Sequence, residues 1–150
     1  MSTVINPICR RAFDTTKLVA EFPPRLSNRN KQIVSRIACP PGSSHSGPIV
    51  FSRWGKMSLP QTLEVASPQT QFEAREDYFG YEPLPEGSPV LEWYLNFAHH
   101  DLFCAYGGPL FAQDEMQVAE HPALGSLREA LLKSDIKPLT VENGEPTPAL

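Results

Sequence analysis

The chain has 150 residues, of which 41% are hydrophobic and 20% are charged, a balance typical of a protein that folds around an apolar core. A single domain is the natural expectation at this length. Its 16 prolines exceed the usual share of about 5% and argue against an all-helical bundle. No uncharged apolar stretch has the length of a membrane span and no signal-peptide core is recognisable. We therefore expect no membrane partner and a cytoplasmic location, with a nuclear one left open.

The charge is distributed unevenly along the chain. Residues 1–60 carry nine basic and two acidic side chains, a net charge of +7, and residues 61–150 carry four basic and fifteen acidic ones, a net charge of −11. Two interpretations follow. The first segment meets a polyanion, such as nucleic acid, or the two segments pack on each other with complementary charge. The second interpretation is favoured because the basic residues are scattered.

Three cysteines stand at wide spacings, at Cys9, Cys39 and Cys104. An odd number without regular spacing predicts reduced thiols and no disulfide framework. The chain has no Cys-x-x-Cys pair and no His-x-x-x-His pair. We therefore expect neither a metal site nor a bound cofactor.

In chain order, the first predicted element is a helix near residues 28–38, followed by a proline- and glycine-rich loop over residues 40–48. The expected apolar stripe of that helix consists of Leu26, Ile33, Ile37 and Ala38. A short strand is predicted over residues 49–54, and residues 56–89 are expected to be mostly connection.

The best strand candidate is the run at residues 90–98, which is rich in leucine, valine and aromatic residues. A helix is predicted over residues 111–120, and its expected core face consists of Phe111, Met116 and Ala119. A second helix is predicted over residues 123–133, with an apolar stripe of Leu124, Leu127 and Leu131. Residues 138–150 look like a polar tail with little to bury.

Because predicted strands and helices are interleaved, we expect an α/β (or α+β) layered fold, preceded by an irregular proline-rich segment. The expected domain organisation has three parts. Residues 1–48 form a basic accessory segment and linker, and residues 49–136 form the layered region. Residues 137–150 are a polar tail or the start of a missing remainder.

The segment from residue 95 to residue 124 carries the densest chemical pattern. An apolar run ends at Asn96, the glycine pair Gly107 and Gly108 follows, and Asp114 and Glu115 stand at the start of the predicted helix. Glycines let backbone N–H groups approach a diphosphate, and a helix N-terminus adds a positive dipole. The alternative is structural, since first-turn carboxylates complement the helix dipole and cap free N–H groups.

Four motifs in this order resemble the poly(ADP-ribose) glycohydrolase family of macrodomains. They are Asn96-Phe97-Ala98 after an apolar run, Gly107-Gly108, Gln113-Asp114-Glu115, and His121-Pro122-Ala123-Leu124. The resemblance implies a macrodomain-like layered sheet with flanking helices. It also implies ADP-ribose or an ADP-ribosylated protein as partner, and hydrolysis of ribose O-glycosidic bonds.

The resemblance also assigns roles to individual residues. Glu115 would be the catalytic acid/base, and Asp114 would orient the ribose as the second catalytic residue. The residues implied to bind the ligand are Asn96, Ala98, Gly107, Gly108, Gln113 and Phe111.

Two alternatives to hydrolysis stay open. Tyr106 stands where the family has a third glycine, and Asp114 stands where it has a first glutamate. These departures are compatible with an inactive module that binds ADP-ribose or another protein. The other alternative is a weak polyanion contact through residues 1–60.

Overall fold

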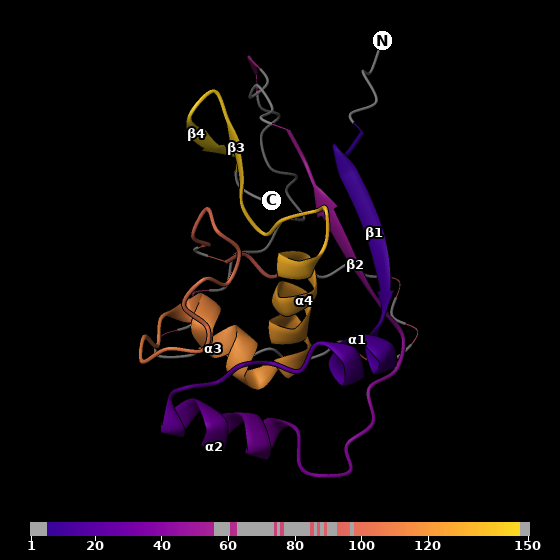
Figure 1. The fold of residues 1–150 in the computed structure, drawn as a ribbon, viewed down its shortest axis with the longest axis vertical. Helices are drawn as coiled ribbons and strands as arrows, with labels where there is room; N and C mark the ends of the chain where they lie inside the picture. The colour runs from indigo at the N-terminus through magenta and orange to yellow at the C-terminus, as the bar shows by residue number, and fades with distance from the viewer. Residues whose placement is uncertain are drawn as a thin grey trace. The chain divides into compact units, whose positions relative to one another are not determined.

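The structure is a computed structural model, and it describes residues 6–55, 61–62, 74, 76, 85, 87, 89, 93–96 and 98–147. Its elements are β1 (Cys9–Asp14), α1 (Thr15–Glu21), α2 (Arg29–Ala38), β2 (Pro48–Arg53), α3 (Gln113–Glu120), α4 (Pro122–Lys133), β3 (Thr140–Glu142) and β4 (Glu145–Thr147). The chain divides into two compact units, one of residues 1–55 with 96–150 and one of residues 56–95. All elements that the structure describes lie in the first unit (Figure 1).

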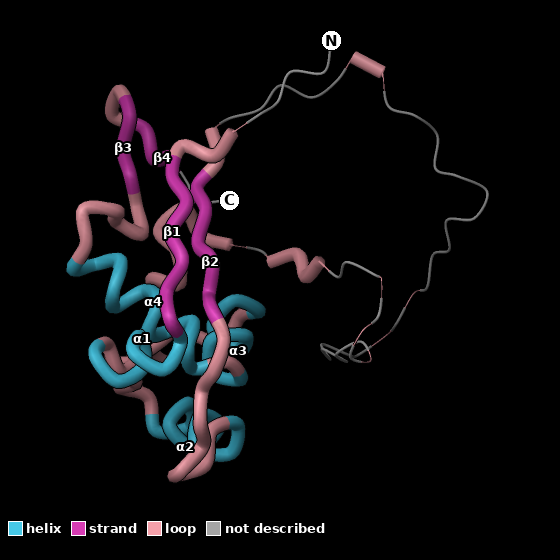
Figure 2. The backbone as a smooth tube through the Cα atoms, turned by 90° about the vertical axis from the view of Figure 1, so that its right-hand side faces the viewer, coloured by secondary structure: helices cyan, strands magenta, loops and turns pink. Residues whose placement is uncertain are grey.

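Strands β1 and β2 form an antiparallel ladder in which Cys9 lies opposite Arg53 and Asp14 lies opposite Pro48 (Figure 2). The side chains of β1 alternate between a half-buried and an exposed face, as the two-residue period of a strand requires. The boundary expected after residue 48 falls within this ladder. Residues 1–48 therefore share a compact unit with α3 and α4, and most of residues 9–38 are in regular elements.

Side chains at their N-termini fix where the first two helices begin. Asp14 accepts a hydrogen bond from the Lys17 N–H at the start of α1. The Oδ1 atom of Asn28 accepts from the N–H groups of Asn30 and Lys31 at the start of α2. Such caps satisfy N–H groups that have no partner inside the helix.

Helix α4 is the centre of the first unit. Its residues Leu127, Ala130 and Leu131 are buried against Leu18 of α1 and Phe51 of β2. A second cluster joins the loop before α3 to α3 itself, and it contains Phe103, Tyr106 and Val118, with Leu26, Leu102 and Leu124 packed against it. Because α4 contributes to both clusters, it connects the β1–β2 ladder to the region around α3.

The last two strands form a hairpin that the sequence analysis missed. Strands β3 and β4 pair antiparallel, and Asn143 and Gly144 between them both have positive φ, at 52° and 82°. A two-residue turn with both φ values positive is the turn that Asn-Gly favours. The sequence analysis predicted a polar tail with little to bury over residues 138–150, and it assigned no strand there, whereas the described residues up to 147 include this hairpin.

Four predicted elements are confirmed within two residues at each end, namely α2, β2, α3 and α4. The strand expected at residues 90–98 is absent from its described part. Residues 93–96 form no strand, and Trp93 and Leu95 are 80% and 89% exposed. Residues 90–92 and Phe97 lie outside the described residues.

Two predicted apolar faces are confirmed only in part, at half-buried Leu26 and at buried Ala119. Ile33 and Ile37 of α2 are 47% and 74% exposed, while Lys31 of the same helix is fully buried. Phe111 and Met116 are also exposed, and the buried face of α3 consists of Asp114, Glu115, Val118 and Ala119. Charged residues thus contribute to the buried faces of both helices.

The described part has a mixed α and β composition with two separate two-stranded antiparallel sheets, and it belongs to the α+β class. Elements β1 and α1 were not predicted, because the two arginines at positions 10 and 11 interrupt the apolar alternation of β1. Among the residues that the structure describes, none of the helices is both long and apolar enough to cross a membrane.

Truncation of Leu131 to alanine tests the central position of α4. Leu131 is fully buried and its neighbour Leu132 is 40% exposed. We expect Leu131→Ala to lower the free energy of unfolding by about 2–5 kcal/mol, because it leaves a cavity in the core. Leu132→Ala is the matched control and should cause a much smaller loss in urea denaturation. Equal losses in the two variants would contradict the packing described.

Candidate functional site

The two predicted catalytic carboxylates lie in the first turn of α3 and are buried. Asp114 is 6% exposed and Glu115 is 3% exposed. The Glu115 Oε2 atom accepts a hydrogen bond from the Ala112 N–H at 3.0 Å, and the Asp114 Oδ1 atom accepts from the Glu115 N–H at 3.0 Å. Both side chains therefore satisfy N–H groups at the start of their own helix, which is the structural role that first-turn acids commonly have.

The carboxyl group of Glu115 has an unusual protonation equilibrium. Burial raises its pKa above the ordinary value of 4.5, and the hydrogen bond to Asp114 and the negative charge of that residue raise it further. Two carboxyl groups this close resist ionising together. The pair therefore combines a group that retains its proton more readily than a free glutamate with a second acid beside it.

Lys31 of α2 approaches this pair, and the sequence analysis did not select it. Its Nζ atom donates to the backbone oxygens of Ala105 at 3.2 Å and Tyr106 at 2.9 Å. The same atom lies 5.1 Å from the centre of the Phe111 ring. Burial lowers the pKa of Lys31, and the negative charges of Glu115 and Asp114 partly oppose that change. The sequence contains no pattern that distinguishes a buried lysine on a predicted helix from a solvent-exposed one.

Two of the predicted ligand-binding residues lie in the segment before the loop. The Asn96 side chain donates from Nδ2 to the Oε1 atom of Gln117, which places it against α3. Its Oδ1 atom is buried and has no hydrogen-bond partner among the described residues. Ala98 is exposed, and Gln113 opens α3 as a half-buried residue. The structure thus brings Asn96 to the same helix as the acidic pair.

The two glycines have different surroundings. A Cβ atom on Gly107 would lie 2.3 Å from the backbone oxygen of Arg25, whereas one on Gly108 would approach only the Ala105 oxygen, at 3.6 Å. The Gly107 carbonyl accepts hydrogen bonds from the N–H groups of Ser27 and Asn28 and from the Ser27 hydroxyl. Gly107 is therefore required for close packing against residues 25–28, which an analysis of motifs alone does not reveal.

A buried polar network holds the same loop to α4. The Tyr106 hydroxyl donates to Glu129 at 2.8 Å and accepts from the Arg25 N–H at 2.7 Å. The Arg25 Nε atom pairs with the other oxygen of Glu129 at 3.2 Å. Burial is the main cause that raises the pKa of Tyr106 to about 12. Arg128 of α4 also pairs with Asp101 at 2.6 Å.

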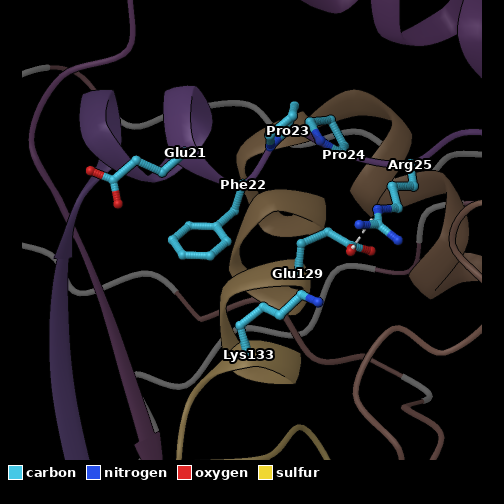
Figure 3. Close-up of a pocket in the computed structure, with 7 residues that line it drawn as sticks. All are labelled: Glu21, Phe22, Pro23, Pro24, Arg25, Glu129 and Lys133. Carbon is cyan, nitrogen blue, oxygen red and sulfur yellow. Dashed lines mark ion pairs between the residues drawn. The ribbon is translucent and has the colours of Figure 1, made fainter.

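An open hollow of about 250 Å³ lies beside this network. It is lined by Glu21, Phe22, Pro23, Pro24, Arg25, Glu129 and Lys133. Figure 3 shows the Arg25–Glu129 ion pair on one side of the hollow and the Phe22 ring on the other. None of its lining residues was predicted as a site residue.

Cysteine and histidine side chains meet in two places. The Cys104 Sγ atom lies 3.4 Å from His99 Nδ1, and the Cys39 Sγ atom lies 3.5 Å from His45 Nε2. Burial and the charge of Asp101 raise the pKa of Cys104, which keeps it a thiol at neutral pH. In the described ranges, no group of three or more histidine, cysteine or acidic side chains is arranged to hold a metal ion.

Comparison with known proteins gives no further assignment. Neither a family model nor a curated protein nor a solved structure matches the chain.

The glycine pair provides a matched test of the loop packing. In Gly107→Ala the new methyl group meets a backbone oxygen that cannot move without shifting residues 25–28. We expect a loss of about 1–3 kcal/mol in the free energy of unfolding, measured by urea denaturation. Gly108→Ala should change it by less than about 0.5 kcal/mol. A neutral Gly107→Ala would show that residues 25–28 do not pack here.

Proposed function

We propose that the chain is an ADP-ribose-handling protein that resembles the poly(ADP-ribose) glycohydrolases, with Glu115 as the acid/base. The observation that carries the proposal is the buried Glu115–Asp114 pair, in which the pKa of Glu115 is raised. A glycosidase needs one carboxyl group that retains a proton near neutral pH and a second acid that stays ionised. The macrodomain-like layered sheet is part of this proposal.

In the proposed reaction, the Glu115 carboxyl group donates its proton to the oxygen that leaves with one ribose. The bond between that oxygen and the anomeric carbon breaks, a water oxygen bonds to the carbon, and a water proton passes back to Glu115. Asp114 orients the ribose, and Asn96 offers its buried Oδ1 atom as an acceptor. Because Glu115 is 3% exposed, substrate entry requires the residues that cover the first turn of α3 to move.

The second candidate is a catalytically inactive module that binds ADP-ribose or another protein. The capping role of the two carboxylates favours this candidate, because both already bond N–H groups of their own helix. In this case Glu115 would stabilise α3 and would not act on a substrate.

The described residues do not test a polyanion contact through residues 1–60, in which Lys17, Arg29 and Arg36 are exposed. Arg11 pairs with Asp135, Arg25 pairs with Glu129, and Lys31 is buried beside α3. These contacts agree with the interpretation that basic and acidic segments pack on each other.

Binding is tested first by thermal denaturation with ADP-ribose, using AMP and ribose 5-phosphate as controls. A ligand that binds only the folded state adds about 2.7 kcal/mol at 100 times its dissociation constant, which raises the melting temperature measurably. We expect a rise with ADP-ribose that neither control reproduces. A cooperative transition that ADP-ribose leaves unchanged would contradict the hydrolase and would leave only a module that binds another protein.

Hydrolysis is tested with Glu115→Gln, whose amide oxygen can still accept the Ala112 hydrogen bond. We expect the variant to release ADP-ribose from a modified substrate at least about 100-fold more slowly, because it has no proton to donate. Its affinity for ADP-ribose should change little. If both proteins bind ADP-ribose and neither releases it, the non-hydrolytic candidate is correct. Equal release rates would remove Glu115 from the mechanism.

A further inference from the structure

Lys31 combines three properties that a solvent-exposed lysine does not have. It is fully buried in helix α2, and its ammonium group donates to the carbonyls of Ala105 and Tyr106. It also lies over the ring of Phe111. A buried ammonium group is costly unless it has hydrogen bonds and a nearby negative charge. The loop before α3 supplies the hydrogen bonds through its backbone carbonyls, and the first turn of α3 supplies the negative charge.

The negative charge is that of the acidic pair. The negative charges of Asp114 and Glu115 of α3 both raise the pKa of Lys31 and partly offset the lowering that burial causes. The loop contributes backbone oxygens and an aromatic ring, which are polar or polarisable and uncharged. One ammonium group therefore lies near two carboxyl groups, and its positive charge favours the ionised form of a carboxyl group beside it.

The hydrogen bonds of Lys31 also bear on the loop geometry. Ala105 and Tyr106 directly precede the glycine pair, and Phe111 precedes α3 by two residues. A single side chain from α2 thus contacts both ends of the segment 105–111. Loss of that side chain would release the loop from α2 as well as change the charge at α3.

We propose that Lys31 is a positioning residue of the candidate site, which fixes the loop ahead of α3 and keeps one carboxylate of the Asp114–Glu115 pair ionised. Its consequence for ligand binding rests on the proposed function. The effect of Lys31 on the ionisation of the acidic pair does not rest on that function, because this ionisation can be measured without any ligand.

The first measurement is an NMR titration of the protein labelled with ¹³C at the glutamate carboxyl carbon, with the Glu115 signal assigned from Glu115→Gln. In Lys31→Met we expect the titration midpoint of Glu115 to rise, because an opposite charge is lost. Lys31→Arg keeps the charge and should restore most of the midpoint. The control Lys17→Met removes an exposed lysine and should leave it unchanged. An unchanged midpoint in Lys31→Met would overturn the proposal.

The reciprocal measurement does not require Lys31→Met to fold. Lysine ¹³Cε signals are followed against pH in the wild type and in Glu115→Gln. Removal of the carboxylate should lower the titration midpoint of Lys31 further, since that carboxylate raises its pKa. A midpoint that does not move would show that the two groups are not coupled and would overturn the proposal.

The third measurement is ADP-ribose affinity as a function of pH. We expect Lys31→Met to weaken binding about tenfold or more at neutral pH, with recovery in Lys31→Arg and no effect of Lys17→Met. Unchanged affinity in Lys31→Met would overturn the positioning role. If the wild type does not bind ADP-ribose, the proposed function fails, and the two titrations still decide the role of Lys31.

Discussion

The burial of helix α4 is the constraint on which the rest of the structure depends. Leu127, Ala130 and Leu131 face the β1–β2 ladder and α1, and Leu124 packs against the cluster around α3. Gly125 permits this arrangement, because a Cβ atom there would lie 2.9 Å from both Pro24 and Tyr106. Apolar burial of this kind is the dominant favourable contribution to folding. The helix therefore holds together segments that are far apart in the sequence.

Charge complementarity operates on top of this core. The basic first segment and the acidic second segment meet at Arg11–Asp135, at Arg25–Glu129 and where Lys31 approaches α3. The first of these pairs is exposed and contributes little, whereas Glu129 is nearly buried and also bonds Tyr106. Buried charges need full hydrogen bonding to be tolerated, and the network around Tyr106 supplies it. The charge asymmetry of the sequence thus has a structural use within one compact unit.

The capping role of the acidic pair and its proposed catalytic role would compete for the same atoms. As helix caps, Asp114 and Glu115 satisfy N–H groups at the start of α3. As acid and base, they would need their oxygens available to a substrate. Lys31 is common to both descriptions, because the charges of the pair act on it and its ammonium group holds the loop that leads to α3. The difference between a hydrolase and a binding module is therefore decided at one helix N-terminus.

The sequence by itself determined the elements whose signals are local. Hydrophobic spacing predicted α2, β2, α3 and α4, since helix and strand periods are set by backbone geometry. The Asn-Gly pair at positions 143 and 144 carried a comparable signal for the last hairpin. The order of Asn96, the glycines and the acidic pair was also readable, because those residues are close in the chain.

Only the tertiary structure decided which faces are buried and which residues approach from elsewhere. Lys31 is 83 residues or more from the acids it faces, and Gly107 packs on a backbone oxygen 82 residues away. Neither contact leaves a periodic pattern, because a single long-range contact constrains one position and not a repeat. Periodicity also chose Ile33 and Ile37 as the buried face of α2, whereas the fold buries Lys31. The position of a charge in a core is set by the partners that the fold brings to it.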